Sequence, residues 1–221
     1  MRKLLSKCWL FLWRWKVSQA EELPERCVMI AAPHTSNWDF PMTLAIAGAT
    51  GNEIRWLGKS QMFVPGLAPI FRWLGGTAVE RSSAQGLVGD LVAEFGRRSK
   101  LILVVPAEAT RTPVEYWKSG FYQIATQAGV PIVCAFVDKK TRTGGYGPLI
   151  TPTGDLAQDM DLIRAFYKDK TGIKPNKFNT PRLREEDALS TGQTRATSTD
   201  SSTSTDSSTD GTAPEKTAST E

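Results

Sequence analysis

Short apolar runs alternate along the chain with longer segments in which apolar residues recur three or four positions apart. A continuous apolar run of roughly four to eight residues is typical of a strand buried on both faces, and the wider spacing is typical of a helix. We expect strands at Cys27–Ala32, Glu53–Leu57, Lys100–Val105 and Pro131–Val137, and helices at Phe40–Ala47, Ser83–Arg98, Ser119–Ala128 and Leu156–Tyr167. This alternation predicts one α/β domain with a mostly parallel central sheet flanked by helices.

Glycine and serine residues mark several expected boundaries. Ser82 or Ser83 is suited to cap the helix that follows it. The pairs Gly144-Gly145 and Gly147-Pro148 predict a turn before a last short strand near Leu149–Thr151.

Both ends of the chain differ from this pattern. In residues 189–221, 18 of 33 positions are Ser or Thr and none is aromatic, so we expect a disordered tail. Residues 19–188 are then the domain, and residues 1–18 an amphipathic helix. The run Cys8–Trp13 is too short to cross a bilayer and lacks a small-residue cleavage site, so neither a membrane span nor a signal peptide is expected.

On a helical projection of residues 1–18, basic side chains lie on one side and large apolar ones on the other. The basic residues are Lys3, Lys7 and Arg14, and the apolar residues are Leu5, Trp9, Leu12 and Trp13. This mixture favours a helix that lies in the interface of an anionic membrane. The alternative is a helix whose tryptophans pack in the core of the domain.

Charge is unevenly distributed. Residues 1–188 contain 25 basic and 18 acidic residues, a net +7, whereas the tail carries −3. A basic body favours an anionic partner, and the absence of a nucleic-acid-binding motif argues against DNA or RNA. Cys8, Cys27 and Cys134 lack C-x-x-C spacing and are expected to be buried or half-buried structural thiols, and with one histidine no metal site is expected.

His34 is the single histidine and follows the apolar run Val28–Ala32, with Asp39 five residues further on. An Asp bonded to one ring nitrogen fixes the tautomer and leaves the other nitrogen free to accept a proton. Such a pair can deprotonate a substrate hydroxyl that attacks an already activated electrophile, such as a thioester. The alternative is that Asp39 caps a helix and His34 is an ordinary loop residue.

Three further segments each place a basic residue at or near the end of a strand-like run. They are Trp56–Phe63 with Lys59, Trp73–Arg81 with Arg81, and Val105–Arg111 with Arg111. Three cations above one sheet would suit a phosphate monoester, although each alone is more often a solvated surface charge.

With these blocks in this order, residues 26–138 resemble the glycerolipid acyltransferase family, which includes 1-acylglycerol-3-phosphate acyltransferases. The family's first block, histidine–four residues–aspartate, matches His34 and Asp39, and its second block matches Gly76–Arg81. Its third block, Pro-Glu-Gly-Thr-Arg, is matched loosely by Glu108, Thr110 and Arg111. Its fourth block, Val-Pro-Ile, matches Val130–Val133. The stretch Trp117–Tyr122 is similar to the smaller bacterial members. Ala109 stands where the family usually has glycine, so a positive φ there would strain the loop.

The resemblance implies a glycerolipid acyltransferase-like fold and an O-acyltransferase of phospholipid biosynthesis, with His34 as base and Asp39 as its orienter. It implies that Arg81, Glu108, Thr110 and Arg111, with Lys59 less directly, bind the acceptor phosphate. No cofactor is expected, and the co-substrate is acyl-CoA or acyl-carrier protein. The expected acceptor is a lysophospholipid, above all 1-acylglycerol-3-phosphate giving phosphatidic acid. The expected location is cytoplasmic, peripheral at the inner face of the cell membrane. The alternatives are another lysolipid or amino-lipid acceptor, or a catalytically silent lipid-binding protein.

Overall fold

The structure is a computed structural model that describes residues 2–79 and 84–188. The chain divides into a compact unit, Met1–Glu186, and a second unit, Asp187–Glu221, of which only Asp187 and Ala188 are described. The predicted disordered tail, residues 189–221, therefore lies outside the described residues.

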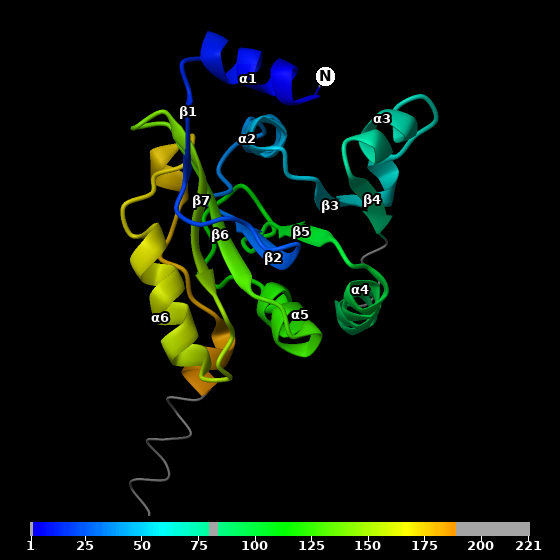
Figure 1. The fold of residues 1–221 in the computed structure, drawn as a ribbon. Coiled ribbons are helices and arrows are strands. Elements are labelled where there is room, and N and C mark those ends of the chain that lie inside the picture. Colours follow the sequence, from blue (N-terminus) through cyan, green and yellow to red (C-terminus); the bar gives the residue numbers. More distant parts are fainter. Residues whose placement is uncertain (1, 80–83, 189–221) are drawn as a thin grey trace, which may run out of the picture. The chain divides into compact units, whose positions relative to one another are not determined.

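A seven-stranded sheet forms the centre of the first unit (Figure 1), in the order β1-β7-β6-β2-β5-β3-β4. Every neighbouring pair is parallel except β6 and β7, which are antiparallel. The strands are β1 (Lys16–Gln19), β2 (Arg26–Ala31), β3 (Ile54–Lys59), β4 (Gly76–Val79), β5 (Leu101–Val105), β6 (Ile132–Asp138) and β7 (Thr143–Ile150). The predicted α/β domain with a mostly parallel sheet is confirmed.

Helices cover both faces of this sheet. On one face lie α1 (Arg2–Leu12), α2 (Asp39–Thr50) and α3 (Ala68–Trp73), and on the other lie α4 (Ala84–Arg97), α5 (Gly120–Ala128) and α6 (Leu156–Tyr167). Alternate residues of β2 enter different cores, since Val28 packs with α4–α6 and Met29 with α1–α2. Burial on both faces explains the continuous apolar runs in the sequence.

Short elements were missing from the sequence prediction. Strand β1 has four exposed residues and no apolar alternation, and β4 begins with glycine and has four residues. Helix α3 is six residues long, and the 3-10 turns η1 (Ser60–Met62) and η2 (Pro175–Lys177) are three residues each. Elements of this length carry too few periodic positions to be recognised from one sequence.

The predicted turn at Gly144–Pro148 is wrong, because these residues form the middle of strand β7. The glycines serve close packing instead. A Cβ on Gly145 would lie 1.6 Å from the Ser18 carbonyl oxygen of β1, and one on Gly147 would lie 2.2 Å from the Phe166 ring. Glycine in a strand interior therefore marks close approach here rather than a bend.

The N-terminal helix is shorter than expected. It ends at Leu12, and Arg14 takes a positive φ of 57° before the chain enters β1, so residues 16–18 belong to the sheet. Helix α1 packs on α2 through Leu10, which is buried. Trp9 in α1 is 37% exposed and Trp13, just after it, is 52% exposed, so these two are not core residues, whereas Trp15 is partly buried and packs against the core on this face of the sheet. None of the helices within residues 2–79 and 84–188 combines the length and apolarity needed to span a membrane.

Candidate active site

The order of strands brings the candidate residues to one edge of the sheet. Strands β2, β5 and β3 are parallel neighbours, so their carboxyl ends meet at the same edge. His34 follows β2, Glu108 to Arg111 follow β5, and Lys59 ends β3. Arg81 follows β4 in the sequence but lies outside the described residues.

The loop between β2 and α2 holds His34 against Asp39. The His34 Nδ1 atom lies 3.4 Å from Asp39 Oδ2, which leaves Nε2 as the free ring nitrogen. The same carboxylate oxygen accepts hydrogen bonds from the backbone N–H groups of Thr35 at 2.6 Å and Ser36 at 2.7 Å. Asp39 is the first residue of α2 and not its cap, since its carboxylate binds the backbone of the preceding loop while it contacts the imidazole.

Residues 172–174, which are distant in sequence, form hydrogen bonds with the loop between β2 and α2. The buried Thr35 hydroxyl accepts hydrogen bonds from the backbone N–H groups of Ile173 at 3.1 Å and Lys174 at 3.0 Å. Gly172 makes this approach possible, because a Cβ there would lie 2.9 Å from the Thr35 hydroxyl oxygen. Residues 172–174 were not recognised from sequence, since nothing local links them to His34. The sequence feature that points to this loop is the polar run Thr35–Asn37 directly after a buried strand.

Glu108 contacts the backbone of His34. The carboxyl is buried, and its Oε1 accepts a hydrogen bond of 2.6 Å from the His34 N–H. Burial raises the pKa of Glu108 to about 7, although the hydrogen bond from His34 opposes this effect. This contact differs from the phosphate-binding role that the resemblance implies for Glu108.

The other residues of the third block lie at the mouth of a cavity. Arg111 Nη1 donates a hydrogen bond to the Asn37 side-chain oxygen and so joins the third block to the first. The Thr110 hydroxyl lies 3.1 Å from that of Thr112. Ala109 takes a positive φ of 56°, which confirms the strain expected where the family usually has glycine.

This cavity has a volume of about 580 Å³. Its polar mouth contains His34, Asp39, Lys59, Thr110 and Arg111, so the structure brings together all the predicted site residues that it describes except Glu108. The cavity continues between α2 and the sheet, where mainly apolar residues line it. They include Ile46, Ile54, Trp56, Val104, Ala135, Val137 and Tyr146. An apolar chamber with a cationic entrance fits a ligand that has both a hydrocarbon chain and an anionic group.

The stretch Trp117–Tyr122 supports the site from the other face of the sheet. Trp117 is buried against Phe121 and Tyr167, and the Lys118 N–H donates a hydrogen bond of 2.8 Å to the Ala107 carbonyl. Ala107 immediately precedes Glu108, so this stretch holds the third-block loop in place. Its contacts are structural.

The cysteines take no part in the site. Cys27 and Cys134 are buried, as expected, and Cys8 is exposed, contrary to expectation, because its side of α1 faces solvent. Burial raises the pKa of both the Cys27 and the Cys134 thiols to about 12. A thiol with so high a pKa is protonated at neutral pH, which argues against Cys134 as a nucleophile.

Comparisons with known proteins identify the family and a similar fold. A protein-family model described as Acyltransferase matches residues 14–138. Among solved structures, the fold is similar to that of the 1-acyl-sn-glycerophosphate acyltransferase PlsC from Thermotoga maritima, with a TM-score of 0.56 and 14% sequence identity over 76% of this chain and 77% of that one. A search of curated proteins found no match.

Proposed function

The chain belongs to the acyltransferase family, and from that premise we propose that it transfers a fatty acyl group from a thioester to the free hydroxyl of a lysophospholipid. The acceptor that fits best is 1-acylglycerol-3-phosphate, which would give phosphatidic acid. The observation that carries the proposal is the placement of His34 and Asp39 at the cationic mouth of an apolar chamber.

His34 is the general base of the proposed reaction. Its Nε2 removes the proton from the acceptor hydroxyl while the hydroxyl oxygen bonds to the thioester carbonyl carbon. The tetrahedral intermediate then collapses, the carbon–sulfur bond breaks, and the imidazolium returns the proton to the thiolate. The products are the acylated lipid and a free thiol. Because the thioester is already activated, no covalent acyl-enzyme is needed.

Asp39 and Glu108 position the base. Asp39 contacts Nδ1 and holds the backbone of Thr35 and Ser36, which fixes the ring and stabilises the imidazolium. Glu108 holds the His34 backbone N–H, and we assign it this positioning role rather than contact with phosphate. A buried carboxyl that already accepts a short hydrogen bond offers little to an anionic ligand.

The acceptor phosphate binds the cations at the mouth. Arg111 is held by Asn37, Lys59 ends β3 at the same edge, and the Thr110 hydroxyl can donate a further hydrogen bond. Arg81 is assigned to this group from the sequence alone. The hydrocarbon chain of a substrate occupies the apolar chamber, where water is excluded from it.

Helix α1 brings this site to the membrane. Its exposed residues include Leu4, Leu5, Trp9, Phe11 and Leu12, and the exposed Trp13 follows directly; these would enter the interface of an anionic membrane. Lys3, Lys7 and Arg14 would meet lipid head groups, and each basic residue near such a surface contributes about 1 kcal/mol.

An acyltransfer assay across several acceptors and both donor types tests the proposal. The acceptors are lysophosphatidate, lysophosphatidylethanolamine and an amino-lipid, and the donors are acyl-coenzyme A and acyl-carrier protein. We expect free thiol and acylated lipid to form in equal amounts, fastest with lysophosphatidate. Thiol release that no acceptor accelerates would contradict acyl transfer, and equal rates with an amino-lipid that carries no phosphate would contradict the phosphate site.

A further inference from the structure

Large apolar side chains are exposed on the segment that follows β3. Met62, Val64, Leu67, Ile70 and Trp73, here called the η1–α3 face, are between 42% and 61% exposed. Leu67, Ile70 and Trp73 recur three positions apart, so they lie on one side of α3. The opposite side, with Ala68 and Phe71, already packs against the domain. This short helix therefore presents apolar residues both to the core and to solvent.

The η1–α3 face is continuous with helix α1 and with the site. The Arg2 guanidinium lies 5.2 Å from the centre of the Trp73 ring, which joins the start of α1 to α3. Just after the other end of α1, the Trp13 ring lies 6.1 Å from that of Trp38, an exposed residue between His34 and Asp39. Met62 belongs to the η1–α3 face and also lines the cavity.

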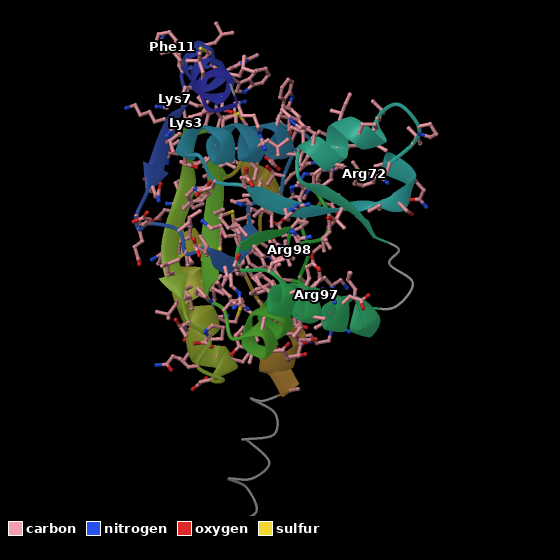
Figure 2. All side chains as sticks on the ribbon, turned by 45° about the vertical axis from the view of Figure 1, so that its right-hand side comes forward. Lys3, Lys7, Phe11, Arg72, Arg97 and Arg98 are labelled. Atoms are coloured by element: carbon pink, nitrogen blue, oxygen red, sulfur yellow. The ribbon has the colours of Figure 1, made fainter. Side chains whose placement is uncertain are left out.

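The charge of this surface is of one sign. Residues 2–15 and 60–75, which form α1, η1, α3 and the turns after the two α-helices, contain five basic residues and no acidic one, namely Arg2, Lys3, Lys7, Arg14 and Arg72. Figure 2 shows Lys3 and Lys7 on α1 and Arg72 on α3, in the upper part of the view. Arg97 and Arg98, at the end of α4 in the same figure, do not belong to this surface, and both form ion pairs with Glu94.

We propose that the η1–α3 face is a second membrane-docking element, which enters the interface of an anionic bilayer beside the cavity mouth. Exposed tryptophans among basic residues are typical of a surface that meets lipid head groups, and monomeric proteins rarely expose large apolar patches without such a partner. With α1 docked as well, the bilayer contacts both sides of the mouth. The inference rests on the proposed function in one respect, since it takes the substrate to be a membrane lipid.

Two matched leucine variants test this docking element. Leu67 is 49% exposed on the η1–α3 face, and Leu162 is 52% exposed on α6 at the other face of the sheet. We expect Leu67→Gln to weaken co-sedimentation with phosphatidylcholine–phosphatidylglycerol vesicles by about fivefold to tenfold, since the leucine no longer leaves water. Leu162→Gln should bind like the wild type. Leu67 lines no part of the cavity, so both variants should acylate a short-chain, water-soluble lysophosphatidate at the wild-type rate.

A labelled residue gives a second readout that does not depend on a destabilising change. Ile70→Cys in a Cys8→Ser background, labelled with a fluorophore that responds to polarity, should shift to shorter wavelength on anionic vesicles and less on pure phosphatidylcholine. Cys27 and Cys134 are buried and should stay unlabelled. The absence of a shift, or equal vesicle binding by the two leucine variants, would overturn the proposal.

Other occupants of the η1–α3 face would also overturn it. A dimer in sedimentation that Leu67→Gln dissociates would assign the face to a second copy of the chain. Loss of acyl-carrier-protein binding in Leu67→Gln, with vesicle binding unchanged, would assign it to that acidic donor. If the wild type transfers no acyl group even between water-soluble substrates, the proposed function fails, and the vesicle comparison still decides the docking proposal.

Discussion

Replacement of Glu108 by Gln tests the buried carboxyl behind His34. Burial raises the pKa of Glu108 from its ordinary value of 4.5 to about 7 in the folded protein. The folded state therefore binds a proton more tightly than the unfolded chain. The stability that this provides is fully present below the unfolded pKa and is lost as the pH rises through the folded pKa.

The shift sets the size of this effect. Between about pH 5 and about pH 8, a carboxyl with these two pKa values lowers the free energy of unfolding by about 2.5 kcal/mol. Gln does not titrate, so Glu108→Gln should gain about that much stability relative to the wild type between these two pH values. Its side-chain oxygen can still accept the hydrogen bond from the His34 N–H.

Urea unfolding of both proteins at the two pH values measures the difference directly. The acyl-transfer activity of Glu108 variants tests the positioning role of this residue separately from the effect of its titration on stability. Glu108→Gln should retain most acyl transfer, whereas Glu108→Ala, which leaves the His34 N–H without this acceptor, should lose ~10-fold or more through a lower kcat. A stability difference that is the same at both pH values would refute the reasoning about the buried carboxyl.

Three further substitutions test other parts of the site. Asp39→Asn should lower kcat by ~10²–10⁴ and the free energy of unfolding by about 1–3 kcal/mol, because it disturbs both the base and two backbone hydrogen bonds. Steady-state kinetics and urea unfolding measure the two effects, and an unchanged kcat would contradict the role of Asp39. Arg111→Ala should raise KM for lysophosphatidate by ~10-fold or more and leave basal thioester hydrolysis unchanged, whereas equal loss of both would indicate a structural role. Ala109→Gly should stabilise the protein by up to about 1 kcal/mol, since φ is 56° there, and a lower melting temperature would show that the loop is not strained.

The sequence predicted the site best where local signals and topology coincide. His34 follows an apolar strand and Arg111 follows another, and the parallel pairing of β2 with β5 carries both to the same edge of the sheet. The role of Glu108 could not be predicted, because its partner is a backbone N–H that belongs to a residue 74 positions away. The same holds for Thr35, whose partners at 173 and 174 are equally remote in sequence.

The errors have the same physical origin. Gly145 and Gly147 resemble turn residues in sequence, and only the positions of Ser18 and Phe166 reveal why glycine is needed within the strand. The exposed side of α3 was not recognised either. Apolar residues in a short helix predict burial, and only the structure shows that Ile70 and Trp73 face solvent.

The central claim is tested most directly by lysophosphatidate acylation with wild-type protein and His34→Ala. Phosphatidic acid is quantified by mass spectrometry, and melting temperatures confirm that both proteins are folded. We predict that the wild type forms phosphatidic acid in equal amount to the released thiol, and that His34→Ala is slower by ~10²–10⁴. Phosphatidic acid formation by His34→Ala within about tenfold of the wild type would contradict the assignment of His34 as the catalytic base.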